Sequence, residues 1–500
     1  MSYTAELPQS LYRAAQVREL DRTAIDGLGI PGLALMERAG VAAFELLQAT
    51  WPEARVITVV CGTGNNGGDG FVLARHALQA DMVVRVLQLG DPERIKGDAR
   101  SNLERYEDAG GSVEPFTEVP VDTEVLVDGI FGTGLEREVT GEWRQAIEVM
   151  NAHRAPVLAL DIPSGLHSDS GQALGVAAQA TATISFIGLK QGLFTGDAPD
   201  YCGRIYFSAL EAPEEVYKAE EPSAMRVTWQ DQAGLLAPRA RTAHKGDCGH
   251  VLVIGGDHGF SGAARMAGEG ALRSGAGLVS VATRTEHATL LSTHRPELMC
   301  HGVEDAAGLS SLLQRATVVA VGPGLGQSDW ACQLLGRVLE TDLPLVLDAD
   351  ALNLLALEPA YRDNWVLTPH PGEAARLLGS NSTDIQADRF QSIKALQERY
   401  GGVAVLKGAG TLVQGSPERP VALCSEGNPG MASGGMGDVL TGVIAALLAQ
   451  GLGIEDAATA GVCLHAAAAD RAAQSGERGL LATDLLPELR PLLNPDAVSC

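Results

Sequence analysis

The chain has 500 residues, 45% hydrophobic and 20% charged, which is the composition of a globular protein of roughly two to four domains. A formal net charge of −25 and an aromatic share of only 4% argue against nucleic acid and anionic membranes as partners, because these favour basic or aromatic-rich surfaces. The 59 glycines lie in short clusters beside apolar runs, which is typical of an enzyme whose backbone approaches its ligands closely.

The cysteines and the N-terminus indicate a cellular compartment. Eight scattered cysteines, without a CxxC pair or a histidine at zinc-ligand spacing, are typical of reduced thiols in a cytoplasmic protein. The first residues lack the basic and apolar regions of a signal peptide. The longest uncharged apolar run, 439–454, is too short and too polar to span a bilayer and predicts a buried helix. We therefore expect a cytoplasmic protein that does not bind membranes.

The first half opens with apolar residues at helical spacing between Leu11 and Ala24. Apolar runs then alternate with helical stretches, a pattern that predicts a parallel sheet covered on both faces. We expect a Rossmann-like three-layer αβα domain over residues 1–215. Its predicted strands are 55–61, 82–89, 124–128, 156–161, 182–188 and 204–208.

An acidic stretch with two prolines, 211–223, predicts a linker. The α/β pattern resumes after it, and we expect a second αβα domain over residues 224–500. Long helices are predicted at 434–450 and 456–474. The predicted strands are 250–256, 277–283, 317–324, 344–350, 364–370, 402–408 and 411–413.

A glycine-rich segment, GTGNNGGDG at 62–70, follows the first of these strands directly and precedes a helix. Such a turn can present backbone N–H groups to an anion at a helix N-terminus. A tight turn without a ligand would use glycines too, but the NNGGDG core is rare and favours a binding function. We do not interpret the segment as a dinucleotide fingerprint, which requires GxGxxG together with an acidic residue about 20 positions later.

Two aspartates end later strands of the same sheet: Asp128 in VDGIFGTGL and Asp161 in LDIPSGL. The carboxyl ends of parallel strands meet at one edge, so we expect both side chains in one crevice. A carboxylate there can bind a cation or transfer a proton. Either aspartate alone could equally cap a loop or a helix.

NNGGDG, DGIFGTGL and DIPSGL, in this order, resemble the NAD(P)H-hydrate epimerase family, and GIPGLALMERAG near the start is similar too. The resemblance implies that Asp161 binds the hydrated nucleotide and handles the proton during inversion at the hydrated nicotinamide carbon. It implies a potassium ion held by Asn66, Asp128 and Ser164. The implied substrate contacts are Asn65, Asn66, Gly67, Gly68, Asp69, Gly132, Thr133, Gly134, Leu135, Glu136, Arg137, Glu138 and Asp161.

In the second half, a glycine-rich loop at 427–437 runs into the long apolar helix that starts near Asp438. Glycines ahead of a helix offer N–H groups and the positive end of the dipole to phosphate. An aspartate in the first turn can accept a proton from an attacking hydroxyl, as phosphoryl transfer requires. The GGMGD pattern resembles the anion-hole motif of the ribokinase-like superfamily, although a glycine-rich turn capped by aspartate would look the same.

Other polar residues of this half have simpler interpretations beside functional ones. His370, between two prolines in a strand-end loop, is interpreted as a ligand contact. Asp348 and Asp350 could help to order magnesium or could cap the following helix. Three histidines recur every seven residues and are interpreted as a surface coincidence, because no carboxylate or cysteine joins them at ligand spacing: His287, His294 and His301.

Together with GPGLG, DADALN, TPHPGE and KGAGT, the GGMGD loop resembles the ADP-dependent NAD(P)H-hydrate dehydratase family. The resemblance implies a ribokinase-like fold, Mg²⁺ bound with ADP, and Asp438 as the base that activates the hydrate hydroxyl before phosphate is eliminated. The family often has a tyrosine where this chain has His244, which leaves the role of that hydroxyl open. The implied substrate contacts are Ala263, Gly324, His370 and Asp438. The implied contacts to the adenine nucleotide are Lys407, Gly408, Ala409, Gly410, Thr411 and Gly437.

The two resemblances cover about residues 10–490. They imply an enzyme that epimerises the R and S forms of hydrated NADH and NADPH and dehydrates the S form at the expense of ADP, assembled as a homo-oligomer through its C-terminal domain. Two alternatives stay open. The second half could be a vitamin or sugar kinase, which would release a stable phosphorylated product. The first half could bind its ligand without catalysis.

Overall fold

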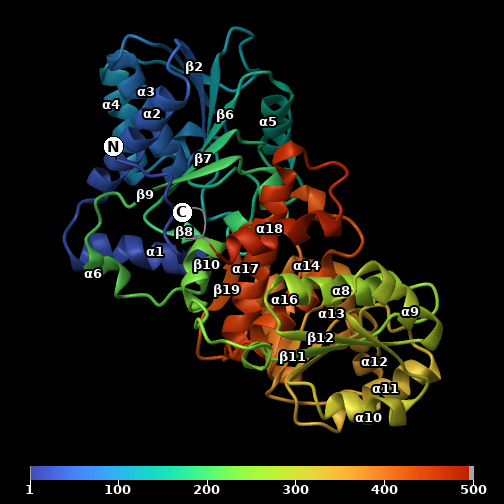
Figure 1. Cartoon of the computed structure of the whole chain (residues 1–500). Helices are drawn as coiled ribbons and strands as arrows, with labels where there is room; N and C mark the ends of the chain where they lie inside the picture. Colours follow the sequence, from blue (N-terminus) through green and yellow to red (C-terminus); the bar gives the residue numbers. More distant parts are fainter. Residues whose placement is uncertain (1, 495–500) are drawn as a thin grey trace. The chain divides into compact units, whose positions relative to one another are not determined.

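The computed structural model describes residues 2–494, and its contacts divide the chain between Met225 and Arg226 (Figure 1). The acidic segment predicted as a linker belongs to the first unit, where α6 (Glu214–Tyr217) buries Val216 completely. Within residues 2–494, no helix is long and apolar enough to cross a membrane.

The first unit contains a sheet of seven described strands in which every neighbouring pair is parallel. All six predicted strands are present. The edge strand β4 was not predicted, because its short, mostly exposed sequence carries no apolar run. In spatial order the strands are β4 (Val113–Pro115), β3 (Val83–Gln88), β2 (Val56–Cys61), β5 (Val125–Gly129), β6 (Val157–Leu160), β7 (Ala182–Phe186) and β9 (Arg204–Ser208).

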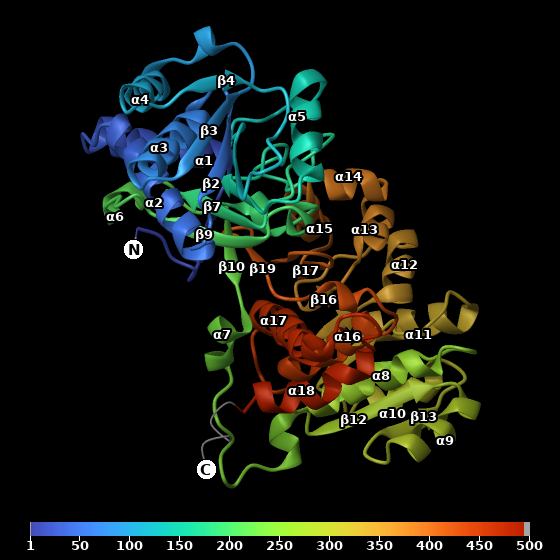
Figure 2. The same ribbon diagram turned by 90° about the horizontal axis from the view of Figure 1, so that it is seen from above.

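Helices cover both faces of this sheet. Consecutive strand residues point to opposite faces, so Val59 joins one hydrophobic cluster and Val60 the other. The cluster of Val59 packs against α2 (Gly32–Thr50), α3 (Asn65–Gln79) and α4 (Gly97–Asp108), and that of Val60 against α5 (Gly141–Ala152). Figure 2 shows α3 and α4 on one side of β2 and β3 and α5 on the other. This is the predicted Rossmann-like αβα arrangement.

The chain start differs from the prediction. Leu11 was expected on a helix, but it lies in β1 (Ser10–Tyr12), and the helix α1 begins only at Ala14 (Ala14–Arg22). The backbone of β1 pairs with β10 (Ala224–Val227) on one side and with β8 (Leu189–Lys190) on the other. These long-range strand pairings override the helical spacing of the apolar residues.

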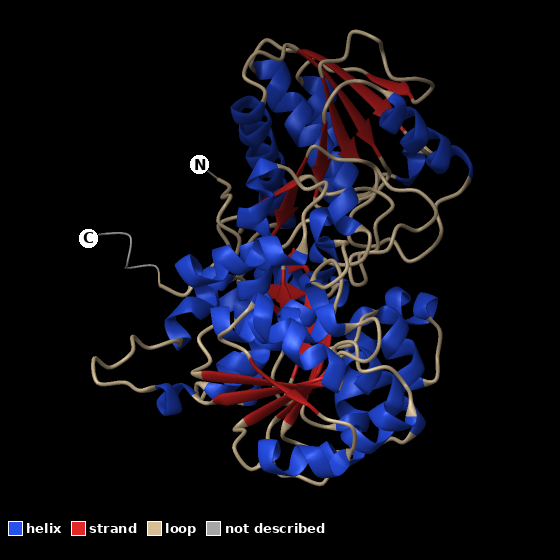
Figure 3. Cartoon of the chain, turned by 45° about the vertical axis from the view of Figure 1, so that its right-hand side comes forward, coloured by secondary structure: helices blue, strands red, loops and turns tan. Residues whose placement is uncertain are grey.

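The second unit is also a doubly covered α/β sheet, with helices on both faces of its strands (Figure 3). In the spatial order given below, the strands from β13 to β17, including β11 and β12, are parallel. Strands β18 and β19 continue the sheet as an antiparallel ribbon. All seven predicted strands are present, whereas β13 and β19 were missed. In spatial order the strands are β13 (Met299–Gly302), β12 (Leu278–Thr283), β11 (His250–Ile254), β14 (Val318–Val321), β15 (Leu345–Leu347), β16 (Trp365–Leu367), β17 (Val403–Leu406), β18 (Thr411–Gln414) and β19 (Val421–Cys424).

Both long helices predicted near the C-terminus are present. The α-helices of this unit are α7 (Trp229–Gln232), α8 (Ser261–Arg273), α9 (Thr285–His294), α10 (Ala306–Leu313), α11 (Asp329–Leu339), α12 (Ala349–Leu357), α13 (Pro371–Leu378), α14 (Ser382–Ala387), α15 (Arg389–Tyr400), α16 (Met436–Ala449), α17 (Ile454–Ala472) and α18 (Leu485–Leu492). In Figure 1, α10, α11 and α12 lie across the strands from α8, α16 and α17.

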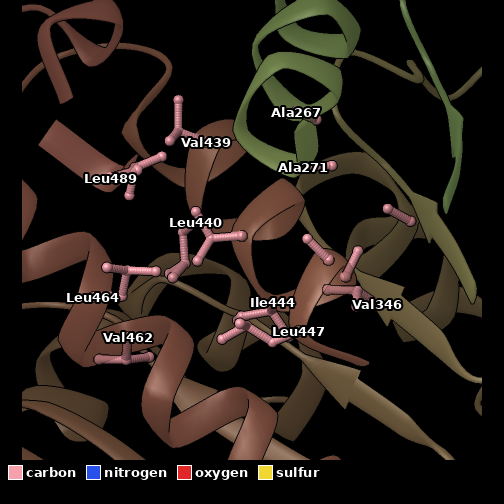
Figure 4. Packing of buried hydrophobic residues seen from close by; sticks show 14 of the residues in the cluster. Ala267, Ala271, Val346, Val439, Leu440, Ile444, Leu447, Val462, Leu464 and Leu489 are labelled. Atoms are coloured by element: carbon pink, nitrogen blue, oxygen red, sulfur yellow. The ribbon is translucent and has the colours of Figure 1, made fainter. Parts of the chain in front are cut away.

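Helices α8 and α16 pack with almost no space between their backbones. A Cβ at Gly442 would lie 1.9 Å from the carbonyl oxygen of Ala267, and one at Gly270 would lie 2.8 Å from that of Val439. Glycine at these positions therefore allows α8 and α16 to touch. Figure 4 shows the cluster that surrounds this contact, to which α8, α16, α17, α18 and β15 contribute. The packing fixes the first turn of α16, which carries Asp438, beside α8.

Candidate active sites

A cavity of about 1000 Å³ lies in the first unit, at the carboxyl ends of β2, β5, β6 and β7. Most of the residues that the sequence predicts as substrate contacts of this unit line the cavity. The remaining predicted contacts, Gly67, Gly68 and Glu138, do not line the cavity. The predicted residues in the wall are Asn65, Asn66, Asp69, Gly132, Thr133, Gly134, Leu135, Glu136, Arg137 and Asp161.

The NNGGDG segment is not a loop ahead of a helix, as predicted, but the first turns of α3, which begins at Asn65. Its glycines serve close packing. A Cβ at Gly67 would lie 2.2 Å from the carbonyl oxygen of Gly62, and one at Gly68 would lie 2.6 Å from the sulfur of Met36. The glycines thus let the helix start directly at the strand end, which directs Asn66 and Asp69 into the cavity wall.

Asp161 has a left-handed backbone with φ of +66°, a conformation uncommon outside glycine, asparagine and aspartate. Its carboxylate forms an ion pair with the ammonium group of Lys190, whose side chain is fully buried. Lys190 also donates hydrogen bonds to Ser185 Oγ (3.0 Å) and to the carbonyl oxygen of Phe186 (3.2 Å). The lysine holds Asp161 in one position at the cavity wall.

Two further carboxyl groups lie close to this ion pair. Burial raises the pKa of Asp69 well above its usual value, and the charge of Asp161 adds to the effect. Burial also raises the pKa of Asp21, to about 6, although Lys190 opposes the shift. Asp21 and Lys190 were not predicted, because neither belongs to a recognisable motif. The cavity therefore combines a carboxylate paired with a cation and carboxyl groups that hold a proton more readily than usual.

Asn66, Asp128 and Ser164, the predicted potassium ligands, lie around the backbone of Ile130 and Phe131. Ser164 donates to Asp128 through Oγ (2.6 Å) and through its N–H (2.8 Å). Phe131 N–H donates to Ser164 Oγ (2.8 Å), and Asn66 Nδ2 donates to the carbonyl oxygen of Phe131 (2.9 Å). Asp128 is fully buried and does not line the cavity, so it does not share the crevice of Asp161 as predicted.

Two observations show that this set fits a cation. Asn66 Oδ1 is buried and has no hydrogen-bond partner among the described residues. Burial raises the pKa of Asp128 to about 6 despite three hydrogen bonds to its oxygens. A buried acceptor without a donor costs free energy, and a nearby cation would satisfy it and favour the charged form of Asp128.

The candidate site of the second unit surrounds the start of α16. Gly435 precedes the helix with φ of +92°, which ends the glycine-rich loop in a left-handed residue. Asp438, half-buried in the first turn, has a pKa raised to about 7 by burial, with the charges of Asp348 and Asp350 adding to the effect and that of Lys407 opposing it. A carboxylate with this pKa is a suitable general base near neutral pH.

Lys407 and Asp348 form an ion pair behind this turn. Lys407 Nζ lies 2.6 Å from Asp348 Oδ1 and 3.8 Å from Glu373 Oε2. Burial alone would lower the pKa of Lys407, but the charges of Asp348 and Glu373 outweigh it and raise the pKa. A Cβ at Gly437 would approach Lys407 Nζ to 3.2 Å. The predicted residues Lys407, Gly437 and Asp438 are thus brought together.

Asp348 and Asp350 do not play equivalent roles. Asp348 makes no capping hydrogen bond to α12, and besides Lys407 it accepts from Thr368 Oγ1 (2.9 Å) and Thr441 Oγ1 (3.0 Å). Asp350 Oδ2 accepts from the N–H of Gly326 (2.9 Å) and so fastens the GPGLG turn. The oxygens of Asp348 are therefore engaged by the protein, and one of them holds the ammonium group of Lys407.

Removing the Lys407 charge should destabilise the second unit. In Lys407→Met, Asp348 stays buried with only hydroxyl partners, and breaking such a pair costs about 3–5 kcal/mol. We expect a lower calorimetric unfolding midpoint of the full chain. Lys394→Met, which changes an exposed lysine on α15, should alter the free energy of unfolding by less than about 0.5 kcal/mol. Equal midpoints for both variants would contradict the structural importance of this ion pair.

His370, predicted as a ligand contact, occupies the N-cap of α13. Its Nδ1 accepts from the N–H of Gly372 (2.9 Å), and its backbone N–H donates to Glu373 Oε2 (2.8 Å). Burial of the ring and the charge of Lys407 lower its pKa. The side chain is 51% exposed, so a neutral imidazole is available to a ligand in addition to capping the helix.

The KGAGT turn is organised by Arg389, which sequence reasoning missed. Arg389 is buried, and its guanidinium donates to the carbonyl oxygens of Leu406 (3.2 Å) and Gly410 (3.3 Å). Thr411 Oγ1 closes the turn by donating to the carbonyl oxygen of Gly408 (2.9 Å). A lone arginine 18 residues before the motif carries no local signal, so only the tertiary structure reveals it.

Of the other predicted substrate contacts, Ala263 lies in the first turn of α8 and Gly324 in the turn after β14. A Cβ at Gly324 would lie 3.1 Å from the Cβ of Ala263 and 2.7 Å from that of Phe260, and the φ of Gly324 is +58°. The predicted residues therefore form two groups: Ala263 with Gly324, and Lys407 with Gly437 and Asp438.

Comparisons with known proteins identify the family of the chain. A family model described as NAD(P)H-hydrate dehydratase matches residues 251–491, and one described as YjeF-related protein N-terminus matches residues 32–192. The bifunctional NAD(P)H-hydrate repair enzyme Nnr of Coxiella burnetii is 53% identical over 97% of this chain and 99% of its own length. That of Escherichia coli strain K12 is 46% identical over 98% and 95%, respectively. The chain belongs to the bifunctional NAD(P)H-hydrate repair enzyme family.

The fold of the second unit is also found in a solved structure. A ribokinase-like superfamily protein of Enterococcus faecalis V583 has a similar solved structure, with a TM-score of 0.51 and 29% sequence identity. The similarity covers 54% of this chain and 95% of the other. The ribokinase-like fold predicted for the second half is thereby confirmed.

Proposed function

We propose that this NAD(P)H-hydrate repair enzyme epimerises the R and S forms of hydrated NADH and NADPH in residues 1–215, and dehydrates the S form with ADP in residues 224–500. The observation that carries the proposal is the placement of Asp438. A carboxyl group with a pKa of about 7 lies at the start of α16, next to the ammonium group of Lys407. This combines a base with phosphate-stabilising groups, as phosphoryl transfer requires.

In the dehydratase site, Asp438 takes the proton of the hydrate hydroxyl as the hydroxyl oxygen attacks the terminal phosphorus of ADP, and AMP leaves with the electron pair of the broken P–O bond. The N–H groups at the start of α16 and the charge of Lys407 stabilise the negative charge that develops. Phosphate then leaves with the electron pair of the C–O bond, and loss of a proton from the adjacent ring carbon restores the double bond. Mg²⁺ bound with ADP would neutralise phosphate charge.

Two groups of residues would hold the ligands of this reaction. The hydrated dinucleotide would contact Ala263, Gly324, His370 and Asp438. The contacts proposed for the adenine nucleotide are Lys407, Gly408, Ala409, Gly410, Thr411 and Gly437. In support, the KGAG turn is held by buried Arg389 and begins at Lys407, whose ammonium group lies beside Gly437.

In the epimerase site, Asp161 would act as the base and Asp69, with its raised pKa, as a proton donor. Inversion at the hydrated carbon requires the hydroxyl to leave or the ring to open, and either route needs a placed acid and base. The nucleotide would contact Asn65–Asp69 on one side and Gly132–Glu138 on the other. Nine of the twelve residues in these two segments line the cavity, as does Asp161, which supports this placement.

Asn66, Asp128 and Ser164 would hold a potassium ion, which would fix the loop after β5 and supply positive charge. We expect KCl to raise the unfolding midpoint of the full chain relative to choline chloride at equal ionic strength. Epimerisation should be slower in choline chloride. Asn66→Ala removes the unpartnered oxygen and should abolish the difference between the two salts. A wild-type midpoint that does not depend on the cation would contradict a potassium site.

The proposed function is tested by incubating the purified full chain with the S hydrate of NADH, Mg²⁺ and either ADP or ATP. We expect NADH, phosphate and AMP to form in equal amounts with ADP. A stable phosphorylated product instead of NADH would favour the kinase alternative. Separately, R hydrate that does not convert to S hydrate without nucleotide would favour a first half that only binds.

Two further properties follow from the family resemblance alone. The chain would form a homo-oligomer through its C-terminal domain, and it would act in the cytoplasm on hydrated cofactors without binding nucleic acid or membranes. Sedimentation of the full chain and of a variant with an altered C-terminal domain surface would test the oligomer.

A further inference from the structure

An unassigned group of potential metal ligands lies in the second unit: His258, Glu286 and His287. His258 lies in the loop between β11 and α8, whereas Glu286 and His287 lie in the first turn of α9, after β12. Strands β11 and β12 are parallel neighbours, so the segments that follow their carboxyl ends meet. The sequence interpretation set His287 aside because no carboxylate joins it, but the fold supplies one together with a second imidazole.

The spacing of the three side chains suits one ion. One ligand atom of each residue lies within 4.8 Å of those of the other two. His258 Nδ1 lies 2.9 Å from Glu286 Oε1, near the roughly 3.0–3.4 Å that separates adjacent ligands around an octahedral or tetrahedral ion bound at about 2.1 Å. The side chains of His258 and Glu286 are 64% and 53% exposed, so an ion and its waters can enter from solvent.

His287 is already oriented as a metal ligand. Its Nδ1 lies 2.9 Å from the carbonyl oxygen of Gly256. A carbonyl oxygen can only accept, so Nδ1 carries the proton and Nε2 of the neutral ring keeps its lone pair. Metal-binding histidines commonly donate their second ring nitrogen to a backbone carbonyl in this way.

The charges around the cluster do not oppose a cation. Arg284 precedes α9 as its N-cap, and its Nε donates to Asp257 Oδ1 at 2.7 Å. Its Nη1 also lies 3.8 Å from Glu304 Oε2. Glu304 is close enough to His258 for the two charges to interact, so it adds negative charge beside the cluster and offsets the positive end of α9.

We propose that His258, Glu286 and His287 bind one divalent late first-row transition metal ion, of the class of Zn²⁺, Co²⁺ or Ni²⁺. Two imidazoles and one carboxylate match these ions, whereas Mg²⁺ prefers oxygen ligands alone. The ion would tie the loop after β11 to α9. Backbone hydrogen bonds join that loop to the turn after β14, from Asp257 N–H to the carbonyl oxygen of Gly324 (2.7 Å), so the ion would also restrain this turn.

The test is a titration of the chelator-treated full chain with Co²⁺, followed by absorbance, and with Zn²⁺, followed by calorimetry, both in excess Mg²⁺. We expect one equivalent to bind. His258→Ala and His287→Ala should each weaken binding by more than the roughly 10–100-fold that loss of an outer-shell partner costs. His244→Ala is the matched control, because His244 is an exposed histidine paired with Asp247 (3.3 Å), and it should bind like the wild type.

Binding of the added metal at a second cluster of potential ligands would contradict the proposal. Cys424, Glu426 and Cys463 also place three ligand atoms within 4.8 Å of one another, but both thiols are buried. Cobalt bound there would show the intense near-ultraviolet band of thiolate ligation, which a site of imidazole and carboxylate lacks. A thiolate band, or equal affinity in the wild type and in His258→Ala, would contradict the proposed site.

Discussion

Asp438→Asn should lower the dehydration rate of the S hydrate by about 10²–10⁴-fold, the range that a positioned general base contributes. The amide cannot accept the hydroxyl proton, yet it occupies the same volume at the start of α16. Epimerisation should be unchanged, because it depends on the other unit. The rate of NADH formation from S hydrate and ADP measures the first effect, and conversion of R to S hydrate without nucleotide measures the second.

The pH dependence sharpens this prediction. Asp438 has a pKa of about 7, so it is protonated and inactive as a base below that pH. Dehydratase kcat/KM of the wild type should therefore rise as the pH increases through about 7, and this step should be missing in Asp438→Asn. The control is Asp456→Asn, which makes the same change in the exposed first turn of α17 and should leave rate and profile unaltered. A folded Asp438→Asn variant with more than a tenth of wild-type activity would contradict a role as base.

Asp161→Asn should reduce epimerisation by a similar factor, about 10²–10⁴-fold, while dehydration of pure S hydrate persists. Asparagine tolerates the left-handed backbone of residue 161, so the change removes the charge without imposing backbone strain. On a mixture of epimers, rapid NADH recovery should stop at the fraction present as S hydrate.

Loss of the Asp161 charge also removes the ion-pair partner of the buried ammonium group of Lys190, so folding must be measured too. Binding of the hydrate mixture, followed by calorimetry, separates lost catalysis from lost structure. Asp122→Asn is the control, because Asp122 pairs with Arg85 (2.7 Å) on the exposed surface. It should keep full activity. Epimerisation that survives in folded Asp161→Asn would exclude this residue as the base.

The sequence was sufficient to predict the two αβα folds, because long apolar strands alternate with helices and each motif follows a strand end. It also indicated Asp161, which follows a strand, and Asp438, which lies in the first turn of a helix after a glycine-rich loop. It could not indicate Lys190 or Arg389, since neither belongs to a motif and each reaches its site through tertiary contacts. The glycines of NNGGDG were assigned to a loop, because the pattern alone does not show that Gly67 packs against Gly62.

The surroundings of the individual aspartates could not be predicted from the sequence. Asp128 lies near the end of β5 and Asp161 follows β6, yet Asp128 is fully buried beside Ser164, whereas Asp161 faces the cavity. Asp348 looked like a magnesium ligand or a helix cap, but its oxygens accept hydrogen bonds from Lys407, Thr368 and Thr441. Such distinctions depend on which side chains surround each carboxylate, and this information is not local in the sequence.

The most direct test of the central claim is the time course of NADH recovery when the wild-type chain is given mixed R and S hydrate with Mg²⁺ and ADP. If one chain carries both activities, reduced-nicotinamide absorbance should recover completely, at a rate above that of spontaneous epimerisation. Recovery that stops at the S fraction would contradict an active epimerase. No recovery with either ADP or ATP would contradict the dehydratase.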